Sequence, residues 1–170
     1  MKRCITPGGG PVTIRRAVTR DAKALTRLVR GSRAYEGQYA AMVAGYRVGP
    51  DYLAAHPVFV AADSGDEQGG VLGFYSLLLA PAELDLLFVA DRVQGRGVGR
   101  LLVAHMLAEA RAAGLTHVRV VSHPPAEGFY RSVGAVPSGT APARPPAVPW
   151  DRPELTFFLT MDAQVRKTVP

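Results

Sequence analysis

The sequence has few of the residues that build cross-linked, metal-binding or membrane-spanning proteins. Cys4 is the only cysteine among its 170 residues, so no disulfide can form within the chain and a cysteine-based metal site is not expected. No apolar run reaches the roughly 18 residues that a membrane span needs, and residues 1–11 lack the apolar stretch of a secretory signal. We therefore expect a cytoplasmic protein without a bound metal and without a membrane partner.

Lysine is also scarce, so the positive charge is mainly arginine. Twenty basic residues against fourteen acidic ones give a net charge of +6. Such an excess can attract an anionic partner, or it can reflect a GC-rich genome, since Ala, Gly and Pro are also abundant. A nucleic-acid binder gathers its basic residues on one face, whereas these arginines are scattered in short groups at 15–16, 27–33 and 96–100. We expect no nucleic-acid partner, because a small phosphorylated ligand needs only one local group.

Hydrophobic residues make up 48 % of the chain, enough for a packed core, and their patterns predict one α/β or α+β domain in which helices cover a mixed sheet. The predicted domain spans 12–161, with a flexible lead at 1–11 and a tail at 162–170. The proline-rich segment 139–153 is predicted to be a loop, because proline cannot lie in a central strand. The remaining elements are six strands at 12–18, 57–63, 71–80, 83–89, 116–122 and 154–161, and helices over 19–30, 33–47, 97–112 and 123–135.

The segment 94–100, Gln-Gly-Arg-Gly-Val-Gly-Arg, lies between a predicted strand and a predicted helix. The N–H groups at a helix start have no partner within the helix and carry partial positive charge, so they attract anions. Gly95, Gly97 and Gly99 allow unusual backbone dihedrals and a close approach of a ligand, and the two arginines add charge. The segment therefore predicts a diphosphate-binding site.

Three phosphate-binding patterns compete for this segment. The P-loop requires a Lys-Ser/Thr pair, which is missing here, and the dinucleotide fingerprint requires a different glycine spacing and an acidic residue about twenty positions later. The pattern Gln/Arg-x-x-Gly-x-Gly is met by Gln94, Gly97 and Gly99. The structural alternative is a glycine-rich turn that only permits tight packing.

On these residues, and on the blocks "LFVADRVQGRGVGRLLVAHML" and "HPPAEGFYRSVGA", the chain resembles the GNAT family of acyl-CoA-dependent N-acetyltransferases. The resemblance extends from about 12 to 161 and is strongest over 83–136. It implies a mixed, mostly antiparallel central sheet of six or seven strands, flanked by about four helices. It also implies acetyl-CoA as cosubstrate, and a homodimer is possible, since dimers are common in the family.

The resemblance also implies where coenzyme A binds. The pantetheine arm would run between the fourth and fifth strands, beside Phe88 and Val89, where the amide of Val89 could stabilise the oxyanion. Ala126 and Tyr130 belong to the second block. The family often has asparagine where His123 stands, so His123 could hold the pantetheine, contact the acceptor or be purely structural. The pyrophosphate would bind the amides of Gln94, Gly95, Arg96, Gly97, Val98, Gly99 and Arg100.

The chemistry implied is the attack of an amine on a thioester carbonyl, which needs an acid for the thiolate and a base for the amine. Tyr130 matches the general acid of the family by position; otherwise it is a core tyrosine. Glu83 and Asp85 are predicted to share one face of their strand, opposite Leu84, Leu86 and Phe88. Either carboxylate could be the base, or could simply pair with an arginine.

The acceptor is expected beside the first two helices, where tyrosines are frequent. Tyr35 and Tyr39 could line a pocket and Glu36 could hold a cationic amine, although an amphipathic helix packing its tyrosines on the core explains them equally well. The loop 139–153, with Trp150, is expected at the same end. The predicted function is direct acetyl transfer to a primary amine of a small molecule. The alternatives are a protein or peptide N-acetyltransferase and a non-catalytic coenzyme A-binding module.

Overall fold

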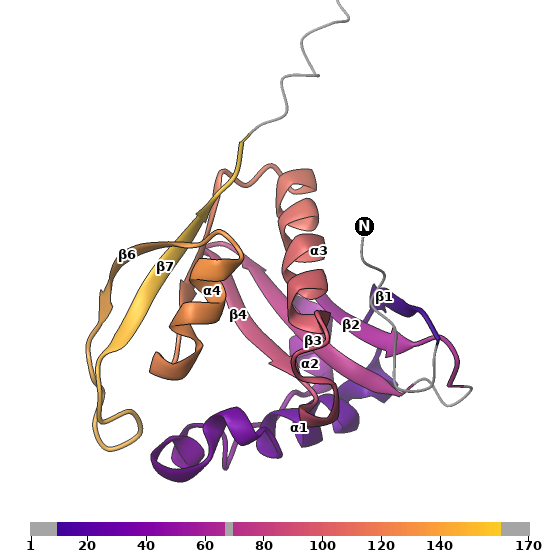
Figure 1. Cartoon of the computed structure of the whole chain (residues 1–170), viewed down its shortest axis with the longest axis horizontal. Coiled ribbons are helices and arrows are strands. Elements are labelled where there is room, and N and C mark those ends of the chain that lie inside the picture. The colour runs from indigo at the N-terminus through magenta and orange to yellow at the C-terminus, as the bar shows by residue number, and fades with distance from the viewer. Residues whose placement is uncertain (1–9, 67–69, 161–170) are drawn as a thin grey trace, which may run out of the picture.

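A seven-stranded sheet with four α-helices forms the part of the chain that the computed structural model describes, residues 10–66 and 70–160 (Figure 1). The strand order is β1-β2-β3-β4-β5-β7-β6, and every neighbouring pair is antiparallel except β4 and β5. The mixed, mostly antiparallel sheet and the helix number confirm the predicted fold class. The strands are β1 (Val12–Arg16), β2 (Val58–Asp63), β3 (Val71–Leu79), β4 (Ala82–Val89), β5 (His117–Val121), β6 (Val136–Ala141) and β7 (Arg152–Phe158). The helices are α1 (Ala22–Arg30), α2 (Pro50–Ala55), α3 (Val98–Ala112) and α4 (Glu127–Ser132).

Helices cover both faces of the sheet, and each face has its own hydrophobic cluster. Leu102 and Met106 of α3 and Tyr130 of α4 belong to one cluster, and Figure 1 shows these two helices in front of the strands. Leu25 of α1 and Leu53 of α2 belong to the cluster on the other face. The sheet is therefore buried from both sides along β2 to β4, where its strands are most apolar.

A β-bulge in β4 changes which way its side chains point. Ser76 of β3 is opposite Leu86, but the next residue, Leu77, is opposite Leu84, so Asp85 is an extra residue in the strand. A bulge of this kind shifts the alternation of side chains between the two faces. Leu84 consequently packs with the α3 cluster, whereas Leu86 and Phe88 pack with the α1 cluster. The prediction that these three residues share one face is wrong for this reason.

The strands β4 and β5 separate after a single point of pairing. Their parallel register is recorded only between Glu83, near the start of β4, and Arg119, in the middle of β5. The ends of the two strands, at Val89 and Val121, therefore belong to a gap rather than to a continuous ladder. This gap provides an open strand edge inside the molecule.

Two other predictions are corrected by the structure. The segment 33–47 contains two 3-10 segments, η2 (Arg33–Tyr35) and η3 (Gly37–Met42), rather than a helix, because Gly37 has a φ of +65° that interrupts helical geometry. Helix α2 was not predicted; proline at its first position suits a helix start. Part of the predicted loop 139–153 is strand, because residues 139–141 complete the edge strand β6 and Arg152 and Pro153 begin β7, where proline is tolerated near the strand start.

The predicted lead and tail lie outside the described residues, except for Gly10 and Pro11. Within residues 10–66 and 70–160, no helix combines the length and apolarity needed to cross a bilayer. The same residues contain no group of three or more His, Cys, Asp or Glu side chains placed to hold a metal ion.

Gly73 allows β3 to approach the end of β4 closely. A Cβ atom at this position would lie 2.7 Å from the carbonyl oxygen of Phe88 and 3.1 Å from Cδ1 of Leu102. We expect Gly73→Ala to lower the free energy of unfolding by about 1–3 kcal/mol, as overpacking does, measured by urea denaturation. The control is Gly128→Ala in α4, where a Cβ meets nothing within 4 Å. Alanine there should be neutral or stabilising by up to about 1 kcal/mol, and equal destabilisation by both variants would contradict the argument.

Candidate functional site

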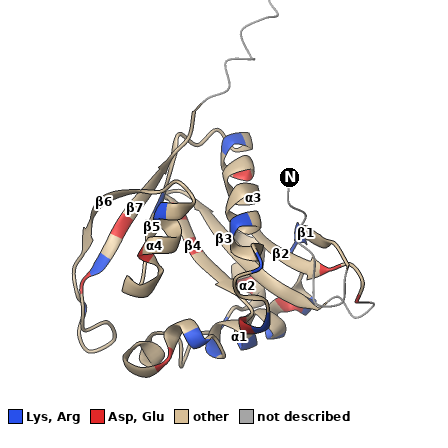
Figure 2. Cartoon of the chain, in the orientation of Figure 1, with Lys and Arg blue, Asp and Glu red and all other residues tan. Residues whose placement is uncertain are grey.

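Backbone amides at the start of α3 face one end of the gap, whereas the amides of Gln94 and Arg96, in the loop before it, donate to the carbonyls of Asp91 and Val93 at 3.2 and 3.3 Å. Gly95 and Gly97 have φ angles of +75° and +85°, in the left-handed region that favours glycine. Leu101 is the first residue of α3 whose N–H donates within the helical turn, to the carbonyl of Gly97 at 3.0 Å. The amides before it, in the first turn of the helix, point outward without an intrahelical partner. Basic residues lie around this helix start and along α1 (Figure 2), which adds to the attraction for an anion.

The loop is braced on both sides. The side-chain Nε2 of Gln94 donates to the carbonyl of Val89 at 3.0 Å, at the end of β4. The Arg100 guanidinium donates to Oγ of Ser132 at 3.3 Å, at the end of α4. Gly99 packs so closely that a Cβ would lie 3.1 Å from Cζ of Phe129. The loop is therefore held in place by β4 and α4. Sequence reasoning did not predict that Phe129 packs against the loop.

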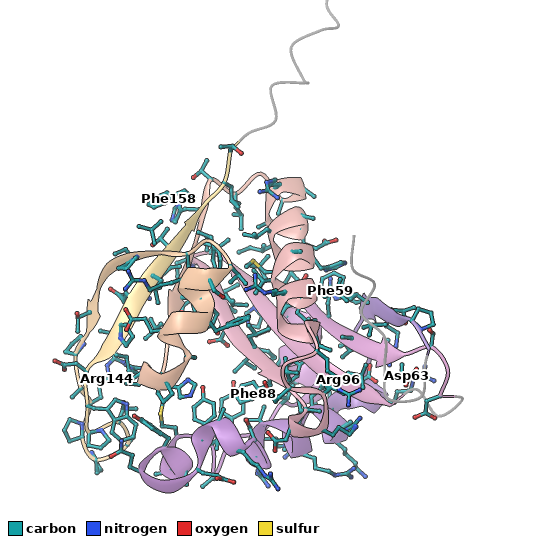
Figure 3. The ribbon with its side chains drawn as sticks, in the orientation of Figure 1. Phe59, Asp63, Phe88, Arg96, Arg144 and Phe158 are labelled. Atoms are coloured by element: carbon teal, nitrogen blue, oxygen red, sulfur yellow. The ribbon has the colours of Figure 1, made fainter. Side chains whose placement is uncertain are left out.

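A cavity of about 350 Å³, here called the loop cavity, extends from this loop along the end of β4 to His123, which follows β5. All residues of 94–100 except Arg96 line it, together with Phe88, Val89, Ala126 and Tyr130. Figure 3 shows Phe88 near the end of β4 and Arg96 on the loop. The structure thus brings together nearly all the residues predicted to bind the cofactor.

The end of β4 offers an unpaired amide to the gap. The N–H of Ala90 donates to the carbonyl of Leu72 in β3 at 2.7 Å. Because successive amides of a strand point to opposite sides, the N–H of Val89 points away from β3, toward the gap. A hydrogen-bond acceptor placed in the loop cavity can reach it.

A second cavity of about 230 Å³ adjoins the loop cavity on the α1 side of the sheet. Glu83 and Asp85 of β4 line it, as do Tyr46 and Arg152. Burial is the main cause that raises the pKa of Tyr46 to about 12, and the nearby charge of Asp85 adds to it. Tyr46 is one of the tyrosines of the region expected to bind the acceptor, whereas sequence reasoning did not assign Arg152 to a site. The residues that line both cavities are Tyr35, Leu87, Phe88, His123 and Tyr130.

Tyr130 stands where the two cavities meet. Its side chain is buried, and among the described residues its hydroxyl has no hydrogen-bond partner. Burial is the main cause that raises the pKa of Tyr130 well above its ordinary value, because a phenolate is poorly solvated there. The phenol therefore remains protonated at neutral pH and has a proton to donate.

His123 forms the wall between the cavities with Tyr35. Their rings stack with centroids 4.2 Å apart, and the ring of Tyr35 also stacks on Phe88 at 5.5 Å. The Nε2 atom of His123 lies 3.1 Å from the carbonyl oxygen of Ala34, which can only accept, so Nε2 carries the hydrogen. Burial, which outweighs this hydrogen bond, lowers the pKa of His123.

The depressed pKa of His123 predicts a pH dependence of stability. The unfolded chain binds a proton at His123 near pH 6.5, whereas the folded chain binds it only at lower pH. The stability that neutral His123 contributes is therefore complete above pH 6.5 and is lost as the pH falls from there through the folded pKa. We expect wild type to lose more stability than His123→Asn between pH 7.5 and 5, in denaturation curves recorded at each pH. Parallel losses in the two proteins would contradict the prediction.

The two candidate carboxylates are held differently. Glu83 accepts from the Arg119 guanidinium at 3.0 Å, and Arg119 also pairs with Glu154, so Glu83 belongs to a charged cluster across three strands. Asp85 instead accepts from the hydroxyl of Tyr52 at 2.5 Å and is exposed. Of the two, Asp85 has the carboxylate without an ionic partner among the described residues.

The other predicted acceptor residues lie near the second cavity but do not all line it. Glu36 is exposed, with its nearest basic partner Arg33 at 3.8 Å, and lines neither cavity. Tyr39 also lines neither cavity, but packs edge-on against His123 and against Trp150, with centroids at 5.7 and 4.8 Å. The connection between β6 and β7 thus reaches the same end of the molecule as the segment 33–42.

Comparison with known proteins agrees with this arrangement. Residues 54–134 match the family model described as acetyltransferase (GNAT) domain. A peptidyl-lysine N-acetyltransferase, YjaB of Salmonella typhimurium, is 36 % identical over 84 residues, which are 49 % of this chain and 53 % of YjaB. The chain therefore spans about half the length of the curated relatives it matches.

Solved structures extend the likeness to the whole fold. A GCN5-related N-acetyltransferase from Rhodopseudomonas palustris superposes with a TM-score of 0.75 at 21 % identity, over 94 % of this chain and 99 % of that one. The yncA protein of Salmonella typhimurium, solved with acetyl-CoA, gives 0.65 at 21 % identity, over 95 % and 98 %. At these identities the likeness shows a shared fold.

Proposed function

We propose that this chain is a GNAT-family enzyme that transfers an acetyl group from acetyl-CoA to a primary amine of a small molecule, a family assignment supported by the match over residues 54–134 and by the fold. The observation that carries the proposal is the meeting of two cavities at Tyr130, one beside the amides of the first turn of α3 and one lined by carboxylates. A donor and an acceptor can occupy these cavities together, which supports direct transfer in a ternary complex.

Acetyl-CoA would occupy the loop cavity. Its diphosphate would accept hydrogen bonds from the amides at the start of α3, where the helix dipole favours negative charge. Its pantetheine arm would lie in the gap along β4, pairing with the open edge of the strand. The acetyl carbonyl would then reach the outward N–H of Val89, which stabilises the negative charge that develops on the oxygen.

The reaction would proceed by direct attack. The lone pair of the neutral amine forms a bond to the thioester carbon, and the carbonyl oxygen becomes an oxyanion. When this intermediate collapses, the carbon–sulfur bond breaks and the sulfur takes the proton of the Tyr130 hydroxyl. The nitrogen loses one proton to a base, and one proton returns through water to the Tyr130 phenolate, so the products are an amide and free coenzyme A and the protein is unchanged.

Asp85 is the better placed base. The Arg119 contact engages the carboxylate of Glu83, whereas Asp85 faces the second cavity with a hydroxyl as its partner. Val89 lies four positions after Asp85, about 13 Å along a strand, so the proton would reach Asp85 through water. Glu83 would then hold β4 and β5 together at their one pairing point.

The second candidate is acetylation of a lysine in a protein or peptide, which the name of YjaB favours. The third is a coenzyme A-binding module without turnover. The test is release of free thiol from acetyl-CoA with a panel of small primary amines and lysine-containing peptides. Turnover with small amines supports the proposal, turnover with peptides alone supports the second candidate, and tight coenzyme A binding without any turnover supports the third.

A further inference from the structure

Arg152 is the first residue of β7, and its side chain lines the second cavity. Its Nε is one of two buried side-chain nitrogens in the described part of the chain that have no hydrogen-bond partner. The carboxylates nearby have other partners, since Glu83 contacts Arg119 and Asp85 contacts Tyr52. Within the described residues, the Arg152 guanidinium therefore faces the cavity without an ionic partner.

An unpaired guanidinium in a cavity is unfavourable unless something else binds it. A buried N–H without an acceptor loses its hydrogen bond to water and gains nothing in exchange. Guanidinium groups match carboxylates in shape, with two parallel N–H donors for the two oxygens. The missing partner of Arg152 is thus best supplied by a carboxylate that arrives with the ligand.

The second cavity has opposite charges on its two sides. Arg152 belongs to β7 and Asp85 to β4, and β5 lies between these strands. Two strand spacings in a paired sheet are about 10 Å, and the separation of β4 from β5 beyond Glu83 adds to the distance between the two backbones, which the two side chains shorten. The volume of about 230 Å³ equals roughly seven or eight waters and is smaller than the pockets of drug-sized ligands. A small ligand with a cationic and an anionic end matches both the charges and the size.

We propose that the acceptor is a free amino acid, whose carboxylate binds the guanidinium of Arg152 and whose amine lies on the Asp85 side, toward Tyr130. The inference rests on the proposed acetyl transfer and narrows its substrate class. Arg152 would act as a specificity-determining residue, because an amine that lacks the carboxylate leaves the guanidinium unpaired. The bond-forming step is the one described above.

The experiment compares amino acids with their α-carboxamides, which keep the amine and the side chain but lose the anionic group. The twenty L-amino acids and the corresponding amides are assayed with acetyl-CoA by thiol release. For the amino acid that wild type prefers, we expect kcat/KM to exceed that of the corresponding α-carboxamide by about tenfold or more. In Arg152→Gln this ratio should fall to about one, while KM for acetyl-CoA stays the same.

The matched control is Arg144→Gln, an exposed arginine in the same connection between β6 and β7 that does not line the cavity. It should keep the wild-type ratio. Equal turnover of acids and amides by wild type, or turnover of peptides only, would overturn the inference while leaving acetyl transfer intact. If no amine is turned over, the proposed function fails. In that case, the melting temperature of the coenzyme A-bound protein, measured with and without the same amino acids, tests whether Arg152 binds a carboxylate. A carboxylate site requires that the amino acids raise the melting temperature of wild type and not that of Arg152→Gln.

Discussion

Tyr130→Phe is expected to lower kcat about a hundredfold or more while leaving KM for acetyl-CoA nearly unchanged. The phenol is buried at the junction of the two cavities and has no hydrogen-bond partner among the described residues. Its raised pKa keeps the proton available, and proton transfer from a positioned group typically contributes about 10²- to 10⁴-fold. The variant loses one oxygen atom from a cavity wall, so packing around the thioester changes little. Steady-state thiol release at saturating amine measures the effect.

The control for Tyr130→Phe is Tyr75→Phe. Tyr75 is equally buried, but its hydroxyl lies 2.8 Å from Nδ1 of His105 and lines neither cavity. Losing that hydrogen bond should cost about 1 kcal/mol of stability with little change in kcat. Wild-type turnover by Tyr130→Phe would remove the acid role from this residue, and an equal loss in both variants would indicate a general effect of the lost hydroxyl.

Gly97→Asp is expected to weaken coenzyme A binding about a hundredfold or more. Gly97 precedes α3 with a φ of +85°, so any side chain there is strained, and an aspartate adds a negative charge beside the amides. A unit charge about 4 Å from a phosphate charge costs about 4 kcal/mol near a protein surface, or about a thousandfold in Kd. Calorimetric titration with coenzyme A measures the loss.

Gly97→Asn separates charge from strain, because asparagine has nearly the same shape and tolerates the left-handed region as aspartate does. We expect the asparagine variant to bind coenzyme A more tightly than the aspartate variant by about tenfold or more, and the difference should shrink at high salt. Equal Kd values for the two variants would show that no phosphate charge lies near this position. Unchanged binding by both would remove the loop from the site.

The parts of the site that depend on local sequence could be predicted. A strand, a glycine loop and an amphipathic helix follow one another in the chain, so residues 88 to 100 meet in space whatever the rest of the fold does. The same holds for Ala126 and Tyr130, which lie on one short helical segment. Their chemistry could be inferred from residue types alone, because free amides at a helix start bind anions.

The parts that depend on sheet register could not be predicted. The bulge at Asp85 is set by how β4 pairs with β3, and it moves Leu84 to the other face. Arg152 reaches the second cavity only because β7 pairs beside β5, a contact between segments some thirty residues apart along the chain. No local pattern distinguishes Arg152 from the other arginines, whereas its buried, unpartnered Nε does.

The prediction of a helix over 33–47 was wrong for a related reason. Its tyrosines recur at helical spacing, but Gly37 takes a positive φ and the segment folds into 3-10 turns. These turns place Tyr35 on His123 and Phe88, which makes it part of the cavity wall, while Glu36 points to solvent. Tertiary packing therefore decided which side chains of this segment reach the site.

The most direct test of the account is a crystal structure of the protein with coenzyme A. We predict that the diphosphate oxygens accept hydrogen bonds from the main-chain amides at the start of α3, and that the pantetheine lies in the gap along β4. The main competitor is the large open groove beside α1, which Arg20, Arg27 and Arg92 line. A diphosphate bound to those arginines, with the amides at the start of α3 left without a phosphate, would contradict the central claim.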